Sequence, residues 1–111
     1  EIGRLKLSYH EAIKLGENPI AFLHYPPVYG GIECEEIMQA LSELGITECY
    51  YGHLHGERTH QNAVTGMYKG IDFHLISADY TRFIPIFGDK YEYFDKLYIV
   101  IFPYICYIIE V

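Results

Sequence analysis

Two short strand-like segments, each leading into histidine, constrain the fold of this chain more than any other feature. Residues 19–23 form a continuous apolar run that ends at His24, and residues 46–51 lead through Gly52 to His53. A continuous apolar run of this length is typical of a strand buried on both faces. Residues 33–44, between the two segments, place their apolar side chains on one stripe, which predicts an amphipathic helix ending near Gly45. Helices that alternate with buried strands predict an α/β layer fold.

Weaker patterns predict further elements on either side of this unit. Ser8 and the glutamate three residues later match a capping box, so a short helix is expected over about residues 9–15. Residues 63–68 and 71–78 are expected to form a hairpin, and residues 83–87 a short edge strand.

Composition limits the partners of the chain. Half of the 111 residues are hydrophobic and the formal net charge is −7, with only eight scattered Lys and Arg residues. A globular domain with one core is therefore expected, and a nucleic-acid backbone is not expected as its main partner, since phosphates require clustered cations. Three cysteines without a C-x-x-C pair predict neither a disulfide framework nor a zinc ribbon. Together with the lack of a visible signal peptide, they favour the cytoplasm.

The two ends of the chain have an unusual character. The chain starts at Glu1, inside an already patterned segment, and we therefore expect a fragment of a longer protein. Residues 1–87 are interpreted as one unit, and residues 88–111 as an atypical hydrophobic tail rich in Tyr and Ile. Its apolar part, residues 97–111, contains a proline and is shorter than the ~20 residues of a membrane helix. We expect a strand-forming or partly disordered tail and no membrane partner.

Three histidines are candidates for a shared metal site. His24, His53 and His55 follow the predicted strands, and the carboxyl ends of parallel strands meet at one edge of a sheet. Neutral imidazole is the commonest metal ligand, and residues two apart in an extended segment project to the same side. Asp79 follows another predicted strand, where its carboxylate either orients a ligand histidine or forms an Asx turn.

The other three histidines are less suited to such a site. His10 lies within the first predicted helix and is expected to be solvated. His60 follows a polar stretch and is expected to be exposed, with a supporting role near the metal as the alternative. His74 lies in the middle of a predicted strand and is expected to be half-buried with one nitrogen satisfied.

Three motifs in this order resemble a known family. They are L-H-Y-P-P at residues 23–27, Y-G-H-L-H-G at 51–56 and L-I-S-A-D-Y at 75–80. Residues 2–86 resemble the C-terminal half of the calcineurin-like metallophosphoesterases. The resemblance implies an α/β/β/α sandwich and a hydrolase, a phosphatase acting on a small phosphate mono- or diester. It also implies two divalent ions (Mn, Fe or Zn), with His24 and His53 binding one and His55 the other.

The chain lacks the rest of the family's site. The family's D-x-H, bridging G-D-x-x-D and catalytic G-N-H-D/E motifs are absent, so its catalytic histidine lies outside this chain. The triplet at residues 72–74 spells D-x-H, but it follows the G-H-x-H turn and lies in mid-strand, so it is not assigned this role. About half of one dinuclear site is present, and the isolated chain is expected to be inactive.

Other interpretations of the same residues stay open. In one, the chain is a non-catalytic fragment in which the three histidines and a water hold a single zinc ion. In another, it is a structural α/β domain without metal. A missing half would also leave a sheet edge open beside residues 22–23 and 49–50, so self-association through that edge is expected.

Overall fold

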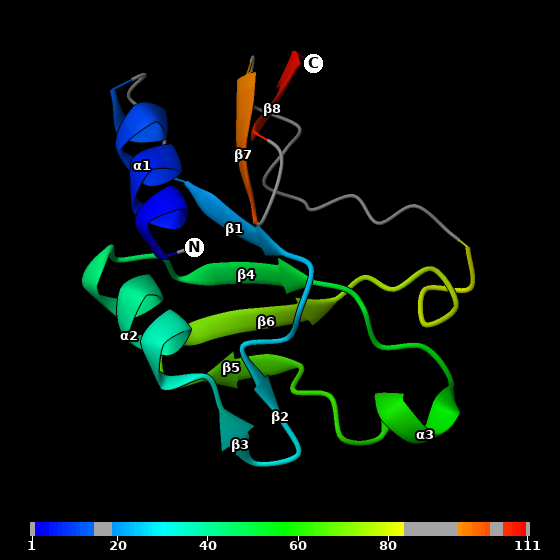
Figure 1. Cartoon of the computed structure of the whole chain (residues 1–111). Helices are drawn as coiled ribbons and strands as arrows, with labels where there is room; N and C mark the ends of the chain where they lie inside the picture. The colour runs from blue at the N-terminus through cyan, green and yellow to red at the C-terminus, as the bar shows by residue number, and fades with distance from the viewer. Residues whose placement is uncertain (1, 15–18, 84–95, 103–105, 111) are drawn as a thin grey trace.

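The structure is a computed structural model that describes residues 2–14, 19–83, 96–102 and 106–110, with side chains up to residue 83 (Figure 1). The helices are α1 (Ile2–Ile13), α2 (Glu35–Glu43) and α3 (Glu57–His60). The strands are β1 (Ile20–Leu23), β2 (Val28–Tyr29), β3 (Ile32–Glu33), β4 (Glu48–Tyr51), β5 (Gly66–Tyr68), β6 (Ile71–Leu75), β7 (Lys96–Phe102) and β8 (Cys106–Glu110).

One mostly parallel sheet organises these elements, in the order β5-β6-β4-β1-β7-β8. Strands β6, β4, β1 and β7 run parallel, while β5 and β8 pair antiparallel at the two edges. The β2 and β3 strands form a separate hairpin. The predicted α/β class is confirmed, and so are the strand before His24, the second helix and the hairpin of β5 and β6.

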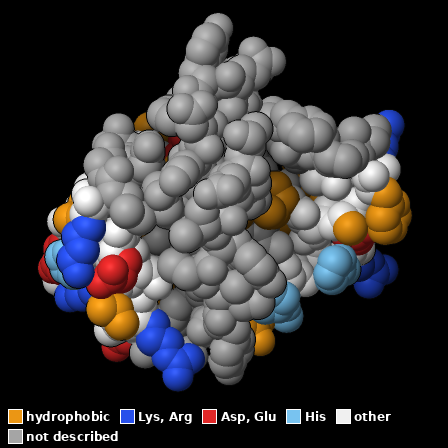
Figure 2. All heavy atoms as spheres, turned by 90° about the horizontal axis from the view of Figure 1, so that it is seen from above, with side chains coloured by type: hydrophobic (Ala, Val, Ile, Leu, Met, Phe, Trp, Pro, Cys, Tyr) orange, Lys and Arg blue, Asp and Glu red, His pale blue; other side chains and the backbone are white. Residues whose placement is uncertain are grey.

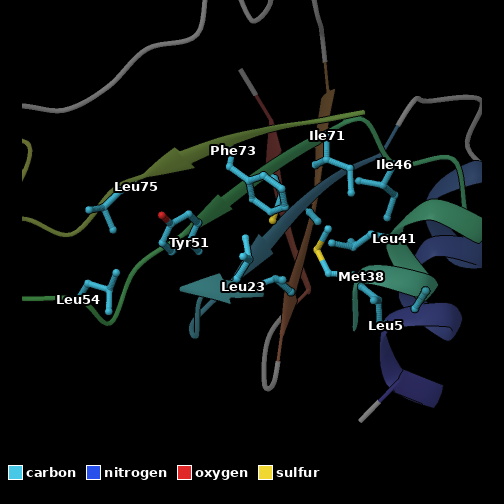
Figure 3. Packing of buried hydrophobic residues seen from close by; sticks show 14 residues of the cluster. Leu5, Leu23, Met38, Leu41, Ile46, Tyr51, Leu54, Ile71, Phe73 and Leu75 are labelled. Atoms are coloured by element: carbon cyan, nitrogen blue, oxygen red, sulfur yellow. The ribbon is translucent and has the colours of Figure 1, made fainter. Parts of the chain in front are cut away.

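The core lies between one face of this sheet and helices α1 and α2 (Figure 3). Every second strand residue points into it, because successive side chains of a strand alternate between its faces. The largest side chains with almost no exposed surface include Tyr51 and Phe73 from the sheet, Leu5 from α1 and Leu41 from α2. Burying each such side chain contributes ~1.5–3 kcal/mol. This packing holds the strands in place and so fixes where their carboxyl ends lie.

Helix α1 begins at Ile2, so the helix start predicted at Ser8 is wrong. Leu5 and Ala12 are buried, and Ile2 and Tyr9 pack partly against the core. These positions form one stripe along the helix, because residues three, four and seven apart share a face. Burial of the whole stripe outweighs the local capping signal, which lies inside the helix.

The edge of β1 is paired, so the open edge expected there is wrong. Strand β1 lies between β4 and β7, with Ile20 opposite Ile99 and Leu23 opposite Phe102. Accordingly, Leu23 is buried, as are Cys49 and Tyr50 on β4. Self-association of the chain stays a prediction, but β1 no longer provides the reason for it.

Two expectations fall partly outside the described residues. Of the expected edge strand at residues 83–87, only Phe83 is described, and it lies in a turn; the expected boundary at residue 87 is also outside them. The tail forms strands where it is described, in β7 and β8. None of the helices in the described part of the chain is long and apolar enough to cross a membrane.

Candidate metal site at the strand ends

The register between β1 and β4 brings His24 and His53 together. Leu23 is opposite Tyr51, and the ladder continues one step further because the Gly52 amide donates to the His24 carbonyl at 3.2 Å. The next residue, His53, places its Nδ1 atom 3.3 Å from Nε2 of His24. Both side chains are exposed, so the pair lies on the surface at the carboxyl edge of the sheet.

His53 occupies a strained turn. Its φ is +67°, and the Leu54 amide donates to the Gly52 carbonyl at 2.8 Å across it. A hydrogen bond between residues two apart, with positive φ at the residue between them, defines the rarer and more strained form of γ-turn. Strain of this kind costs ~1–3 kcal/mol and persists where the surrounding structure enforces it, often at functional sites.

This turn separates His53 from His55. The premise that the segment is extended at His53 is wrong, so residues 53 and 55 do not project side by side. The turn buries the Leu54 side chain, which anchors the loop in the core. His53 then contacts His24, whereas His55 contacts Asp79.

Asp79 holds His55 in one tautomer. Its Oδ1 atom lies 3.0 Å from Nδ1 of His55, and its Oδ2 atom accepts from the Gly56 amide at 2.7 Å. An ionised carboxylate only accepts hydrogen bonds, so the proton of neutral His55 is on Nδ1 and its Nε2 lone pair is free to bind a metal. Asp79 also accepts from the Tyr80 amide at 3.0 Å, but an Asx turn requires the amide two residues on, so its contacts favour the role of orienting His55.

These hydrogen bonds determine the charge state of Asp79. The hydrogen bond from the Gly56 amide is the main cause that lowers the pKa of Asp79 to about 2. Burial opposes this shift in part, while the His55 side chain and the nearby His60 add to it. The carboxylate therefore stays ionised at any physiological pH. Gly56 is needed for this contact, since its φ of +88° is a conformation that L side chains rarely adopt.

His60 is mostly buried and contacts the turn at residues 52–54, so its expected exposure is wrong. Only 15% of its side chain is exposed, and its Nε2 donates to the Leu54 carbonyl at 3.0 Å. Thr59, one residue earlier, contacts the carbonyls of His55 and Gly56 through its hydroxyl. The sequence contains little indication that His60 lies in a helix against the turn, because the four polar residues of α3 are too few to show a helical period.

The remaining histidines lie away from the pair. His10 is exposed on α1, as expected. His74 is half-buried on β6, as expected, but its buried Nε2 has no hydrogen-bond partner, so the satisfied nitrogen expected there is not found at Nε2. This atom lies 3.1 Å from an Asp72 carboxylate oxygen without forming a hydrogen bond. The ring of His74 stacks on Tyr50, at a centroid distance of 4.5 Å.

The distance between the two imidazoles is compatible with a hydrogen bond between them and also with two ligands of one metal ion. Two imidazole nitrogens that share one ion, with bonds of ~2.1 Å and angles between octahedral and tetrahedral, are about 3.0–3.4 Å apart. The observed 3.3 Å falls in that range. Within the described residues, however, no three His, Cys, Asp or Glu side chains gather in a way that could hold an ion. The pair could supply two ligands, and His55 one more at a separate position.

The histidines stand on an open surface. Figure 2 shows histidine side chains at the surface on the side of the molecule where α3 lies. A cavity of about 370 Å³ is found elsewhere, between α2 and the β5–β6 turn, and none of the three candidate ligands lines it. Comparison with family models, with curated proteins and with solved structures found no match.

The Asp79 contacts predict a specific pH dependence of stability. We expect Asp79→Asn to unfold at lower urea concentration than the native chain at pH 5, because the amide is a poorer acceptor for Gly56 and His55. In the native chain the pKa of Asp79 is about 2, below the ~3.9 of an unfolded aspartate. The ionised side chain therefore adds its full contribution to the free energy of unfolding above about pH 4, and this contribution declines as the pH falls toward 2. Urea denaturation of both proteins between pH 5 and 2 measures the difference. A difference that stays constant over this range would contradict the account.

Proposed function

We propose that this chain carries half of the dinuclear site of a metal-dependent phosphoesterase. In this proposal His24 and His53 bind one divalent ion, His55 binds the other, and the completed site hydrolyses a small phosphate mono- or diester. The observation that carries it is the 3.3 Å separation of two imidazole nitrogens at the ends of adjacent parallel strands. The motif order resembles the calcineurin-like metallophosphoesterases, and the wider α/β/β/α sandwich and a cytoplasmic location belong to the same proposal.

The described residues would prepare the ligands rather than perform the chemistry. Paired divalent ions, when bound, supply Lewis-acid stabilisation of phosphate oxygens and activate water. The chain contributes orientation: the β1–β4 register sets the spacing of His24 and His53, and Asp79 leaves Nε2 of His55 free. Because these ligands are held before binding, less conformational entropy is lost when an ion enters.

The missing groups explain why the isolated chain is proposed to be inactive. Within the described residues no carboxylate joins the His24–His53 pair, and Asp79 is already engaged with Gly56 and His55. Phosphoryl transfer depends mainly on positioning and on neutralising charge, which nitrogen ligands alone do poorly. In the proposal, the bridging carboxylate, the catalytic Asn-His pair and most of the walls that select the substrate come from outside residues 1–111. The native metal among Mn, Fe and Zn is decided by those additional ligands.

The ligand assignment predicts how single substitutions change metal binding. We expect the isolated chain to bind one zinc ion, and His53→Asn to weaken binding at least tenfold while preserving the turn, since Asn tolerates positive φ. His55→Ala should leave the first ion in place, because His55 is assigned to the other position. His10→Ala is the control for losing an exposed histidine. Zinc calorimetry on the four proteins gives these affinities.

The same measurement separates the competing interpretations. If His55→Ala loses the ion as completely as His53→Asn, the three histidines hold one zinc and the non-catalytic fragment is favoured. If the unmodified chain binds no metal, the structural-domain interpretation is favoured and the proposal falls.

A second prediction concerns turnover. The isolated chain should hydrolyse neither p-nitrophenyl phosphate nor its bis-ester with added manganese, because the bridging and catalytic groups are missing. Release of p-nitrophenolate, followed by absorbance, is the measurement. Clear turnover that disappears in His53→Asn would show that the chain completes the site itself and that the predicted inactivity is wrong.

A further inference from the structure

Tyr25 lies against both members of the His24–His53 pair. Its ring centroid is 4.7 Å from that of His24, at an interplanar angle of 83°, and 4.5 Å from that of His53, at 58°. Despite these two contacts, 59% of the residue is exposed. A large aromatic side chain beside two candidate metal ligands thus keeps most of its surface open to solvent.

The backbone around Tyr25 is fixed on both sides. The preceding carbonyl, of His24, accepts from the Gly52 amide at 3.2 Å. The following residue is Pro26, which restricts Tyr25 to extended conformations, and the Pro27 carbonyl accepts from the Cys34 amide at 2.8 Å. The exposed ring is therefore presented by a rigid segment, so stacking on it would order little additional backbone.

We propose that Tyr25 is a specificity-determining residue that stacks on the ester group of the substrate, and that the substrate class is phosphate esters of flat aromatic groups, such as aryl or nucleoside monoesters. This inference rests on the proposed function. A phosphate bound by the metal at His24 and His53 has its ester group on the side away from these ligands. The Tyr25 ring contacts both histidines and offers an exposed aromatic surface beside that group. Aromatic rings favour offset or edge-to-face contacts at centroid distances of 4.5–7 Å, and nucleobases stack on tyrosine in the same way.

Tyr80 offers a matched control, because its ring contacts His60, which donates to the Leu54 carbonyl next to His53. It is also exposed, at 43%, but its ring contacts His60, at a centroid distance of 5.2 Å, and no ring contact joins it to the pair among the described residues. Tyr80→Leu therefore removes an exposed tyrosine near the turn without changing the surface beside the metal pair. Tyr25→Phe keeps the ring and removes only the hydroxyl.

The test compares phenyl phosphate with methyl phosphate, by calorimetry on the zinc-loaded full chain. Phenyl phosphate should bind about three- to tenfold more tightly, as expected for one aromatic contact. The ratio should fall to about one in Tyr25→Leu and survive in Tyr25→Phe and Tyr80→Leu, and inorganic phosphate should bind Tyr80→Leu as tightly as it binds the native chain. Equal binding of the two esters to the native chain, or a preference that survives in Tyr25→Leu, would overturn the proposal.

Failure of the proposed function gives a different result. In that case phenyl phosphate, methyl phosphate and inorganic phosphate each bind the zinc-loaded native chain no more tightly than the His53→Asn variant. The proposed role of Tyr25 is then wrong together with the proposed site. Phosphate binding that needs His53 but shows no aromatic preference overturns the role of Tyr25 alone.

Discussion

The pairing of β1 with β4 is the constraint on which the candidate site depends. These parallel strands are aligned so that Leu23 lies opposite Tyr51, and the hydrogen bond from Gly52 to the His24 carbonyl extends the ladder to the two histidines. A shift of one residue would exchange the faces of the strand, so that Leu23 would leave the helix-covered core and Phe22 would enter it. The same hydrophobic pattern that fixes the core therefore fixes the distance between His24 and His53.

Both faces of the sheet support this register. On the helix-covered face, the side chains of Ala21 and Cys49 are completely buried opposite one another. On the other face, Phe22 stacks on Tyr50 at a centroid distance of 4.8 Å, and Tyr50 stacks on His74, which makes a three-ring row across β1, β4 and β6. Cross-strand aromatic pairs of this kind add ~0.2–1 kcal/mol each. The position of the histidines is thus defined by side chains that do not touch them.

The sequence predicted the elements that depend on long apolar patterns. The α/β class, the strand before His24, the α2 helix and the hairpin of β5 and β6 all follow from such patterns. The start of α1 was mispredicted because a local capping signal competed with an apolar stripe that acts only through tertiary packing. The partner of β1 could not be predicted either, since β7 lies more than 70 residues further along the chain and local periodicity carries no information about it.

The part of the site that follows from the strand patterns was predicted, and the part that depends on tertiary contacts was not. Two strands that each end in histidine indicate a pair at one edge, and the pairing of Asp79 with His55 was one of two alternatives that the residues allowed. The γ-turn at His53 was not predicted, because an extended segment was expected there and positive φ is uncommon for residues other than glycine. A supporting role for His60 was only the second alternative, because no sequence pattern records its hydrogen bond to a backbone carbonyl.

The contact between the two imidazoles is the direct test of this account. In a chain with isotope-labelled histidine, a nuclear Overhauser spectrum should show a cross-peak between ring protons of His24 and His53, assigned by its loss in His24→Ala and His53→Asn. The aromatic contact between Phe22 and Tyr50 on the same two strands serves as the internal reference for the register. We predict both cross-peaks in the absence of metal. A spectrum with the Phe22–Tyr50 contact but without the contact between the histidines would contradict the account.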